Sequence, residues 1–185
     1  MIHNFWRIMD KVIYESDIIL EVVDARMPNL TRNEKLENKI RRERKFLIIV
    51  MNKADLITGR MKINFLRRFR PNEAIFVSCK DRVGIPTLKE MIFDLAKRVR
   101  YKDYIRVGVI GYPNTGKSSL INSLVGFKEV ARTSPIAGFT TGVQWVRGRG
   151  KIMFLDSPGV IPSDEKDEAE QALMSIIDPN KLKDP

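Results

Sequence analysis

Residues 111–118 read GYPNTGKS, which matches the pattern G-x-x-x-x-G-K-S. The apolar run Tyr104–Ile110 comes directly before this stretch, and apolar residues at helical spacing follow it. A strand, a glycine-rich loop and a helix are therefore predicted in succession. Gly111 and Gly116 would let the backbone curve tightly and turn its N–H groups toward an anion. The stretch predicts a loop that holds the phosphates of a nucleotide.

Side chains at the end of this loop have the chemistry that a nucleoside triphosphate requires. Lys117 can reach the β and γ oxygens as a point charge, and the Ser118 hydroxyl can ligate Mg²⁺. The helix that starts here would add its N-terminal dipole to the phosphate site. The residues of this segment that we expect to contact the nucleotide are Gly111, Asn114, Thr115, Gly116, Lys117, Ser118 and Ser119.

A second motif, N-K-x-D at residues 52–55, follows the apolar run Phe46–Val50. A carboxylate such as Asp55 only accepts hydrogen bonds, and the guanine edge offers it two parallel donors that adenine lacks. Asn52 could bond guanine N7 or hold the loop, and the Lys53 stem could lie over the purine ring. An ordinary surface loop is the alternative, but next to a phosphate loop a guanine reader is favoured.

Together these motifs resemble those of the translation-factor-related class of GTPases. In chain order they are Asn52–Asp55, Ser78-Cys79-Lys80 in place of an S-A-K loop, Gly111–Ser118, a switch threonine at Thr140 or Thr141, and the D-x-x-G segment Asp156–Gly159. The order is rotated, because the first two motifs usually follow the phosphate loop. In this respect the chain is similar to the circularly permuted GTPases of the YlqF/RbgA and YawG type, which also carry Asp-Ala-Arg-x-Pro early, here Asp24–Pro28.

The resemblance implies GTP and GDP as ligands, with Mg²⁺ as the metal. Ser78, Cys79 and Lys80 would complete the guanine site. Asp156 would hold the metal through water, and Gly159 would offer its N–H to the γ-phosphate. The implied catalytic residues are Lys117, Thr140 and Gly159, and the implied metal residues are Ser118, Thr140 and Asp156.

Two residues bear on the expected rate of GTP hydrolysis and on the ions it requires. The residue after D-x-x-G is Val160, which cannot hydrogen-bond to the attacking water. The permuted relatives share a hydrophobic residue there, so we expect slow intrinsic GTP hydrolysis. Asn114 matches potassium-activated GTPases with the same Pro-Asn-x-Gly-Lys-Ser sequence, and we hypothesise that it helps hold a K⁺ ion beside the phosphates.

Strand-like apolar runs alternate with helical patterns along the chain. The runs outside the phosphate-loop unit are Ile18–Val23, Phe46–Val50, Ala74–Val77, Gly142–Val146 and Ile152–Leu155. The last two are separated by a turn at 147–150, which favours an antiparallel hairpin. The predicted fold is a three-layer α/β P-loop GTPase fold, circularly permuted, with a mostly parallel sheet. We expect one domain over residues 1–185, with 163–185 as a helical extension; family members usually continue into a further C-terminal module.

The composition of the chain limits the kinds of binding partner and the structural classes that fit it. The chain has 185 residues, a formal net charge of +10, one cysteine and one histidine. These counts exclude a disulfide framework and a zinc cluster, and the longest apolar run is too short for a membrane span. Basic residues cluster at 60–70, 97–102 and 147–151, which favours a polyanionic partner, although each cluster could be only a solvated face. Trp145 is expected to pack near the switch segment rather than to stack on bases.

By resemblance and charge we expect a cytoplasmic GTPase switch that binds ribosomal RNA or a ribosomal subunit during ribosome assembly, and we assume a monomer. An ATP-using P-loop ATPase or kinase is one alternative, and a non-switching RNA-binding module is another. The sequence leaves open which subunit is bound, which activator acts, and what positions the attacking water.

Overall fold

The computed structural model describes residues 2–71, 73–99, 103–126, 144–148 and 150–157. Six strands form one sheet in the order β3-β2-β1-β4-β6-β5. In chain order they are β1 (Ile18–Asp24), β2 (Phe46–Asn52), β3 (Ala74–Phe76), β4 (Ile105–Ile110), β5 (Gln144–Arg147) and β6 (Ile152–Asp156). The β5–β6 pair is antiparallel and the other four neighbouring pairs are parallel. The predicted sheet with one hairpin is confirmed.

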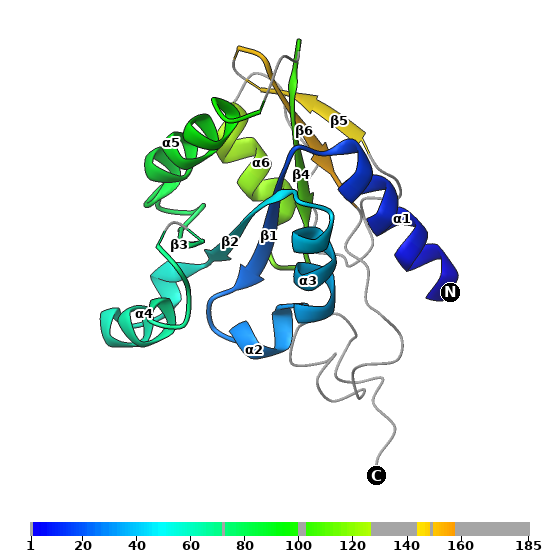
Figure 1. Cartoon of the computed structure of the whole chain (residues 1–185). Coiled ribbons are helices and arrows are strands. Elements are labelled where there is room, and N and C mark those ends of the chain that lie inside the picture. The colour runs from blue at the N-terminus through cyan, green and yellow to red at the C-terminus, as the bar shows by residue number, and fades with distance from the viewer. Residues whose placement is uncertain (1, 72, 100–102, 127–143, 149, 158–185) are drawn as a thin grey trace.

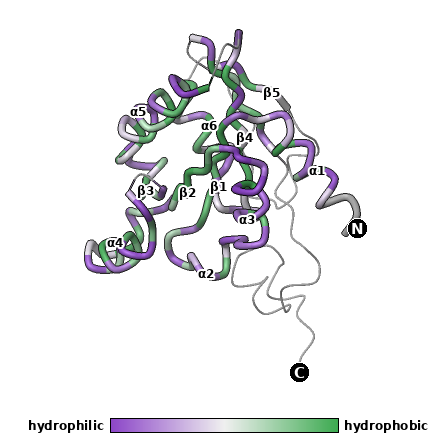
Figure 2. The backbone as a smooth tube through the Cα atoms, in the orientation of Figure 1, coloured by the Kyte–Doolittle hydropathy of each residue, from purple (hydrophilic) through white to green (hydrophobic). Residues whose placement is uncertain are grey.

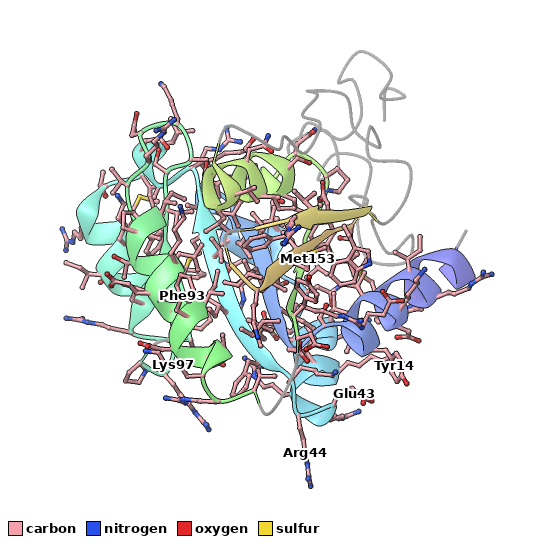
Figure 3. All side chains as sticks on the ribbon, turned by 90° about the horizontal axis from the view of Figure 1, so that it is seen from above. Tyr14, Glu43, Arg44, Phe93, Lys97 and Met153 are labelled. Carbon is pink, nitrogen blue, oxygen red and sulfur yellow. The ribbon has the colours of Figure 1, made fainter. Side chains whose placement is uncertain are left out.

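Helices cover both faces of the sheet (Figure 1). They are α1 (Ile2–Glu15), the short α2 (Pro28–Thr31), α3 (Glu34–Arg42), the 3₁₀ turn η1 (Ala54–Leu56), α4 (Gly59–Leu66), α5 (Ile85–Ala96) and α6 (Lys117–Val125). Seen from above, α5 with Phe93 and Lys97 lies on one side of the sheet, and α1 with Tyr14 lies on the other (Figure 3). The predicted three layers are therefore present.

The strands are continuous apolar runs because both of their faces are buried. Every residue of β1 is buried, and successive side chains alternate between two cores. One core joins β1, β2, β4 and β6 to α5 and α6, for example through Leu20, Leu88 and Leu120. The other joins the sheet to α1 and α3, for example through Ile19 and Ile40. In Figure 2 the backbone along β2, in the middle of the molecule, has the colour of hydrophobic residues.

Element ends differ from the predictions by one to three residues. Strands β1, β2 and β6 each run one or two residues further than expected and end on the polar residues Asp24, Asn52 and Asp156. Hydropathy alone does not show this, because backbone pairing with the neighbouring strand extends past the last apolar residue. The helix around Leu88 begins earlier, at Ile85. The expected extension 163–185 lies outside the described residues, and none of the helices described is long and apolar enough to cross a bilayer.

Candidate nucleotide-binding site

The predicted motifs follow strands that are neighbours in the sheet. Strands β2, β1, β4 and β6 are adjacent and parallel, so their carboxyl ends lie along one edge. Asn52, Gly111 and Asp156 all lie at or just after these ends. Ligands of open α/β sheets bind at this edge, where successive crossovers turn to opposite faces of the sheet. Here α3 follows β1 on one face and α6 follows β4 on the other.

The glycine-rich loop after β4 curves through two left-handed glycines. Gly111 has φ 147° and Gly116 has φ 96°, values that side chains disfavour. A Cβ atom on Gly116 would collide with the Asn52 amide, so the close approach of residues 52 and 116 requires glycine. Thr115 is buried and donates through Oγ1 to the Tyr112 carbonyl at 2.9 Å. Helix α6 starts at Lys117, which places its N-terminus at the loop.

The Lys117 ammonium lies inside the curve of the loop. Nζ donates to the carbonyls of Gly111 at 3.0 Å and Tyr112 at 2.9 Å. Burial lowers the pKa of Lys117 to about 8, and the charge of Asp156 partly opposes that shift. A phosphate entering the loop would supply the negative charge that two neutral carbonyls do not.

Ser118 and Asp156 fit a hydrated magnesium ion. Ser118 Oγ donates to Asp156 Oδ2 at 3.0 Å, which joins the first turn of α6 to the end of β6. The other carboxylate oxygen, Oδ1, is buried and has no hydrogen-bond partner among the described residues. Burial raises the pKa of Asp156, and the Ser118 hydroxyl and the Lys117 charge oppose the shift. A cation held by the hydroxyl and by water on the carboxylate would satisfy that oxygen.

The N-K-x-D segment forms hydrogen bonds with the phosphate loop. Asn52 Nδ2 donates to the Thr115 carbonyl at 3.0 Å, and Lys53 Nζ donates to the Asn114 carbonyl at 2.7 Å. The Asn52 Oδ1 atom accepts from the Cys79 N–H at 3.3 Å. One asparagine thus ties the 78–80 loop to the phosphate loop. These contacts join residues about sixty positions apart in one site.

The residues predicted to surround the base lie beside these contacts. Asp55 is exposed in the first turn of η1. Burial raises the pKa of the Cys79 thiol to about 11, and the nearby Asp55 carboxylate adds to that shift. Cys79, Lys80 and Ser119 line a hollow of about 620 Å³ between the 78–80 loop and α6, whereas Asp55 does not line it. Ser78 is buried and bonds within its own loop, to Asp81.

Asp24 was missed as a site residue, although the sequence marks it as part of Asp24–Pro28. Its buried carboxylate accepts from Lys53 Nζ at 2.7 Å and from the Arg26 guanidinium, also at 2.7 Å. Burial alone would raise the pKa of Asp24, but hydrogen bonds from Arg26 and Lys53 lower it. The structure adds that Asp24 pairs with Asn52 across β1 and β2, next to Lys53, and the sequence alone does not show this register. The Lys53 ammonium therefore bonds both Asp24 and the phosphate loop.

Several predicted residues lie outside the described part of the chain. They are the switch threonines Thr140 and Thr141, Gly159 and the neighbouring Val160. Their roles, and the K⁺ site at Asn114, stay predictions. In the described ranges no three or more His, Cys, Asp or Glu side chains form a group that could hold a metal ion.

Comparison with known proteins agrees with this geometry. Residues 106–182 match the family described as 50S ribosome-binding GTPase. An uncharacterized GTP-binding protein of Methanocaldococcus jannaschii is 42% identical over 97% of this chain and 47% of its own length. Nucleolar GTP-binding protein 2 of Pneumocystis carinii is 36% identical over 98% of this chain and 39% of its own length. The chain spans less than half the length of these relatives.

The fold has a solved counterpart. GNP-bound YlqF from T. maritima superimposes with a TM-score of 0.67 at 22% identity, over 98% of this chain and 70% of that one. At this identity the likeness shows the fold. The family match over residues 106–182, the GTP-binding relatives, the sheet order and the rotated motifs all agree, and the chain has the fold of the circularly permuted P-loop GTPases.

Proposed function

We propose that this protein binds and hydrolyses GTP as a switch in ribosome assembly. The observation that carries the proposal is the pair of hydrogen bonds from Asn52 and Lys53 to the carbonyls of the phosphate loop. They bring a guanine-type recognition motif and a phosphate-binding loop into one site. In the alternative, an ATP-using enzyme, the N-K-x-D sequence would be an ordinary surface loop. Such a loop would not need to form these two hydrogen bonds with the phosphate loop.

Within the proposal each residue has a defined task. The loop 111–118 wraps the phosphates, with Lys117 on the β and γ oxygens. Ser118 would ligate Mg²⁺ and Asp156 would hold it through water, and the ion would neutralise charge on the phosphates. Asp55 reads the two guanine donors. Thr140 and Gly159 sense the γ-phosphate, and their release after hydrolysis is the switching step.

Hydrolysis by the isolated protein is expected to be slow. Val160 has no group that could orient the attacking water, so the water depends on backbone groups, another residue or a partner. Equal GTPase rates in sodium and potassium buffers would remove the K⁺ hypothesis at Asn114. A rapid single-turnover rate for the protein alone would contradict the proposed role of Val160.

The test of base recognition is Asp55→Asn, which exchanges an acceptor for a donor. We expect the preference to shift from guanine toward xanthine nucleotides, measured as Kd for GTP and XTP by fluorescent-nucleotide competition. Asp94→Asn is the matched control, because it removes the same charge from an exposed position on α5. If the Asp55 variant binds GTP as well as the parent does, Asp55 does not read the base.

The ribosomal role is supported by the family description, by relatives named as nucleolar GTP-binding proteins and by the charge of +10. A reducing, cytoplasmic-type setting fits the single cysteine. The test is co-sedimentation with ribosomal subunits in GDP and in a non-hydrolysable GTP analogue. Association that differs between the two nucleotides and weakens with salt supports a switch on RNA. Equal, salt-insensitive association contradicts it.

A further inference from the structure

Two aromatic and two arginine side chains gather around Met153 on an open part of the sheet. Tyr104, Arg106, Trp145, Arg147 and Met153 line a hollow of about 330 Å³. We name these five residues the Trp145 patch. Strand pairing places Arg106, Met153 and Arg147 side by side in one row across β4, β6 and β5. Met153 is labelled on this strand group in Figure 3.

The patch lies just beyond the cover of helix α1. At Gly108, two residues further along β4, a Cβ atom would press into Val12 and Ser16 of the α1 segment. Arg106 lies two residues before Gly108, outside this contact. The row of side chains formed by Arg106, Met153 and Arg147 is therefore not covered by α1. Trp145 in β5 is 39% exposed, and Tyr104, just before β4, is 46% exposed, so both aromatic side chains are accessible to solvent. The switch segment lies outside the described residues, so the expected packing of Trp145 near it stays a prediction.

The described residues that line the hollow carry two arginines and no carboxylate. Arg106 lies over the Trp145 ring at 5.6 Å from its centroid. One carboxylate adjoins the patch, because Asp17 Oδ2 accepts from the Arg106 backbone N–H at 3.0 Å. The Ile105 N–H donates to the Lys151 carbonyl at 2.7 Å, which brings Lys151, another basic residue, beside the start of β4.

We propose that the Trp145 patch binds unpaired nucleotides of RNA. Exposed aromatic rings stack on bases, and arginines pair with phosphates or lie over ring faces. Stacking requires open base faces, which single strands and loops have and a duplex does not. An acidic protein could match the charge, but it would not use two exposed aromatic faces in the same way. Single-stranded RNA is therefore the ligand that fits the patch.

This inference rests on the proposed RNA contact. Arg106 is near the amino end of β4, five residues before Gly111, and that distance is about 17 Å along a strand. Trp145 pairs with Leu155, directly before Asp156, so the patch extends from the amino end of β4 toward the metal-site edge of the sheet. None of the five patch residues belongs to the phosphate loop 111–118.

Tryptophan fluorescence gives a direct test of stacking. The chain has two tryptophans, so Trp6→Phe leaves Trp145 as the single emitter. A single-stranded oligoribonucleotide of about 12 nucleotides should quench it, and the matched duplex should quench it much less. Quenching of Trp145 by both to the same extent, or by neither at saturation, would overturn the inference.

Binding of the fluorescein-labelled oligonucleotide tests the side chains. Trp145→Ala should weaken binding about fivefold or more, and Trp145→Phe should restore most of it, because phenylalanine also stacks. A loss in both variants would mean that a fold defect, not stacking, causes it, and would overturn the assignment. No loss in either would do the same.

A charge-matched pair separates the arginines from general electrostatics. The double variant Arg106→Ala/Arg147→Ala should reduce the slope of log Kd against log salt by about 1.4, since each phosphate contact on a single strand contributes about 0.7. Arg60→Ala/Arg67→Ala removes the same charge from exposed positions on and just after α4. If this control lowers the slope equally, the RNA is held by net charge and not by the patch.

GTP binding is measured on the same proteins to keep the two proposals apart. Lys117→Ala should abolish GTP binding and leave oligonucleotide affinity in the absence of nucleotide unchanged. A parent protein that binds GTP but no single-stranded RNA refutes the patch and leaves the GTPase proposal in place. A parent that binds RNA through Trp145 but no GTP refutes the GTPase proposal and leaves the patch in place.

Discussion

At the scale of single residues, Lys117 links the geometry of the loop to pH. Its ammonium is buried against two carbonyls, and burial lowers its pKa to about 8. Phosphate oxygens would favour the charged form, so nucleotide binding must raise that pKa. We expect affinity for GDP to be nearly constant below about pH 7, to be about twofold lower at pH 8 and about tenfold lower at pH 9, where most of the free protein holds a neutral lysine.

Isothermal titration at pH 7, 8 and 9 checks this, with proton uptake on binding near pH 8 as a second readout. Lys117→Arg is the control, because an arginine stays charged over this range and should remove the pH dependence that belongs to the lysine. Any dependence that remains in the variant belongs to guanine itself. Identical pH profiles for the parent and the arginine variant would contradict a titrating Lys117.

Asp24 and Lys53 form a second unit at this scale. The buried carboxylate holds the Lys53 ammonium, which also donates to the phosphate loop. Asp24→Asn keeps the shape and removes the charge, so Lys53 should lose its orientation and GTP affinity should fall about tenfold, the range of one charged hydrogen bond. Arg26→Ala is the control, because it keeps the Asp24–Lys53 pair. Equal losses in the two variants would mean that Asp24 acts through Arg26.

At the scale of elements, a buried carboxyl fastens α3 to β1. Glu21 is fully buried in β1 and its Oε1 accepts from the Asn33 N–H at 2.8 Å, where α3 begins. Burial, and next the negative charge of Glu37, raise the pKa of Glu21 well above its ordinary value. The folded protein therefore keeps Glu21 protonated at pH values where the unfolded chain has lost the proton.

This raised pKa predicts how stability changes with pH. The contribution of Glu21 to the free energy of unfolding is complete below about pH 4.5 and decreases as pH rises toward its folded pKa. Glu21→Gln cannot ionise, so its stability relative to the parent should rise by about 1.4 kcal/mol per pH unit in that window. Urea unfolding at pH 5, 6, 7 and 8 measures it. Glu43→Gln, at an exposed position after α3, should show no such trend.

The sequence predicted the elements better than the contacts between them. Periodicity identified β1, β2, β4 and α6 because both faces of each strand are apolar and the glycine loop has its own pattern. It could not show that Glu21 is buried opposite Glu37 or that Asp24 holds Lys53. These contacts depend on which strands are neighbours and on which helix covers them, and no local pattern contains that information.

At the scale of the whole molecule, the convergence of residues 52–55 with 111–118 was predictable, since parallel strands share one carboxyl edge. The position of Trp145 was not. Its neighbours Arg106 and Met153 come from other strands, and α1 stops short of them. The partial exposure of Trp145 therefore depends on contacts between strands that are distant in the sequence.

The permuted chain places the two halves of one site at distant points of the sequence, and this gives a last prediction. Contacts from Asn52 and Lys53 to the phosphate loop cross between the two halves, so a nucleotide should stabilise both halves at once. At a GDP concentration of 100 times Kd with Mg²⁺, the gain is about 2.7 kcal/mol, or a rise in Tm of about 5 to 10 °C. Differential scanning calorimetry should show one transition that moves as a unit. ATP and the Lys117→Ala variant serve as controls and should give no shift. Two transitions, of which GDP moves only one, would mean that the halves unfold separately and that the nucleotide does not join them.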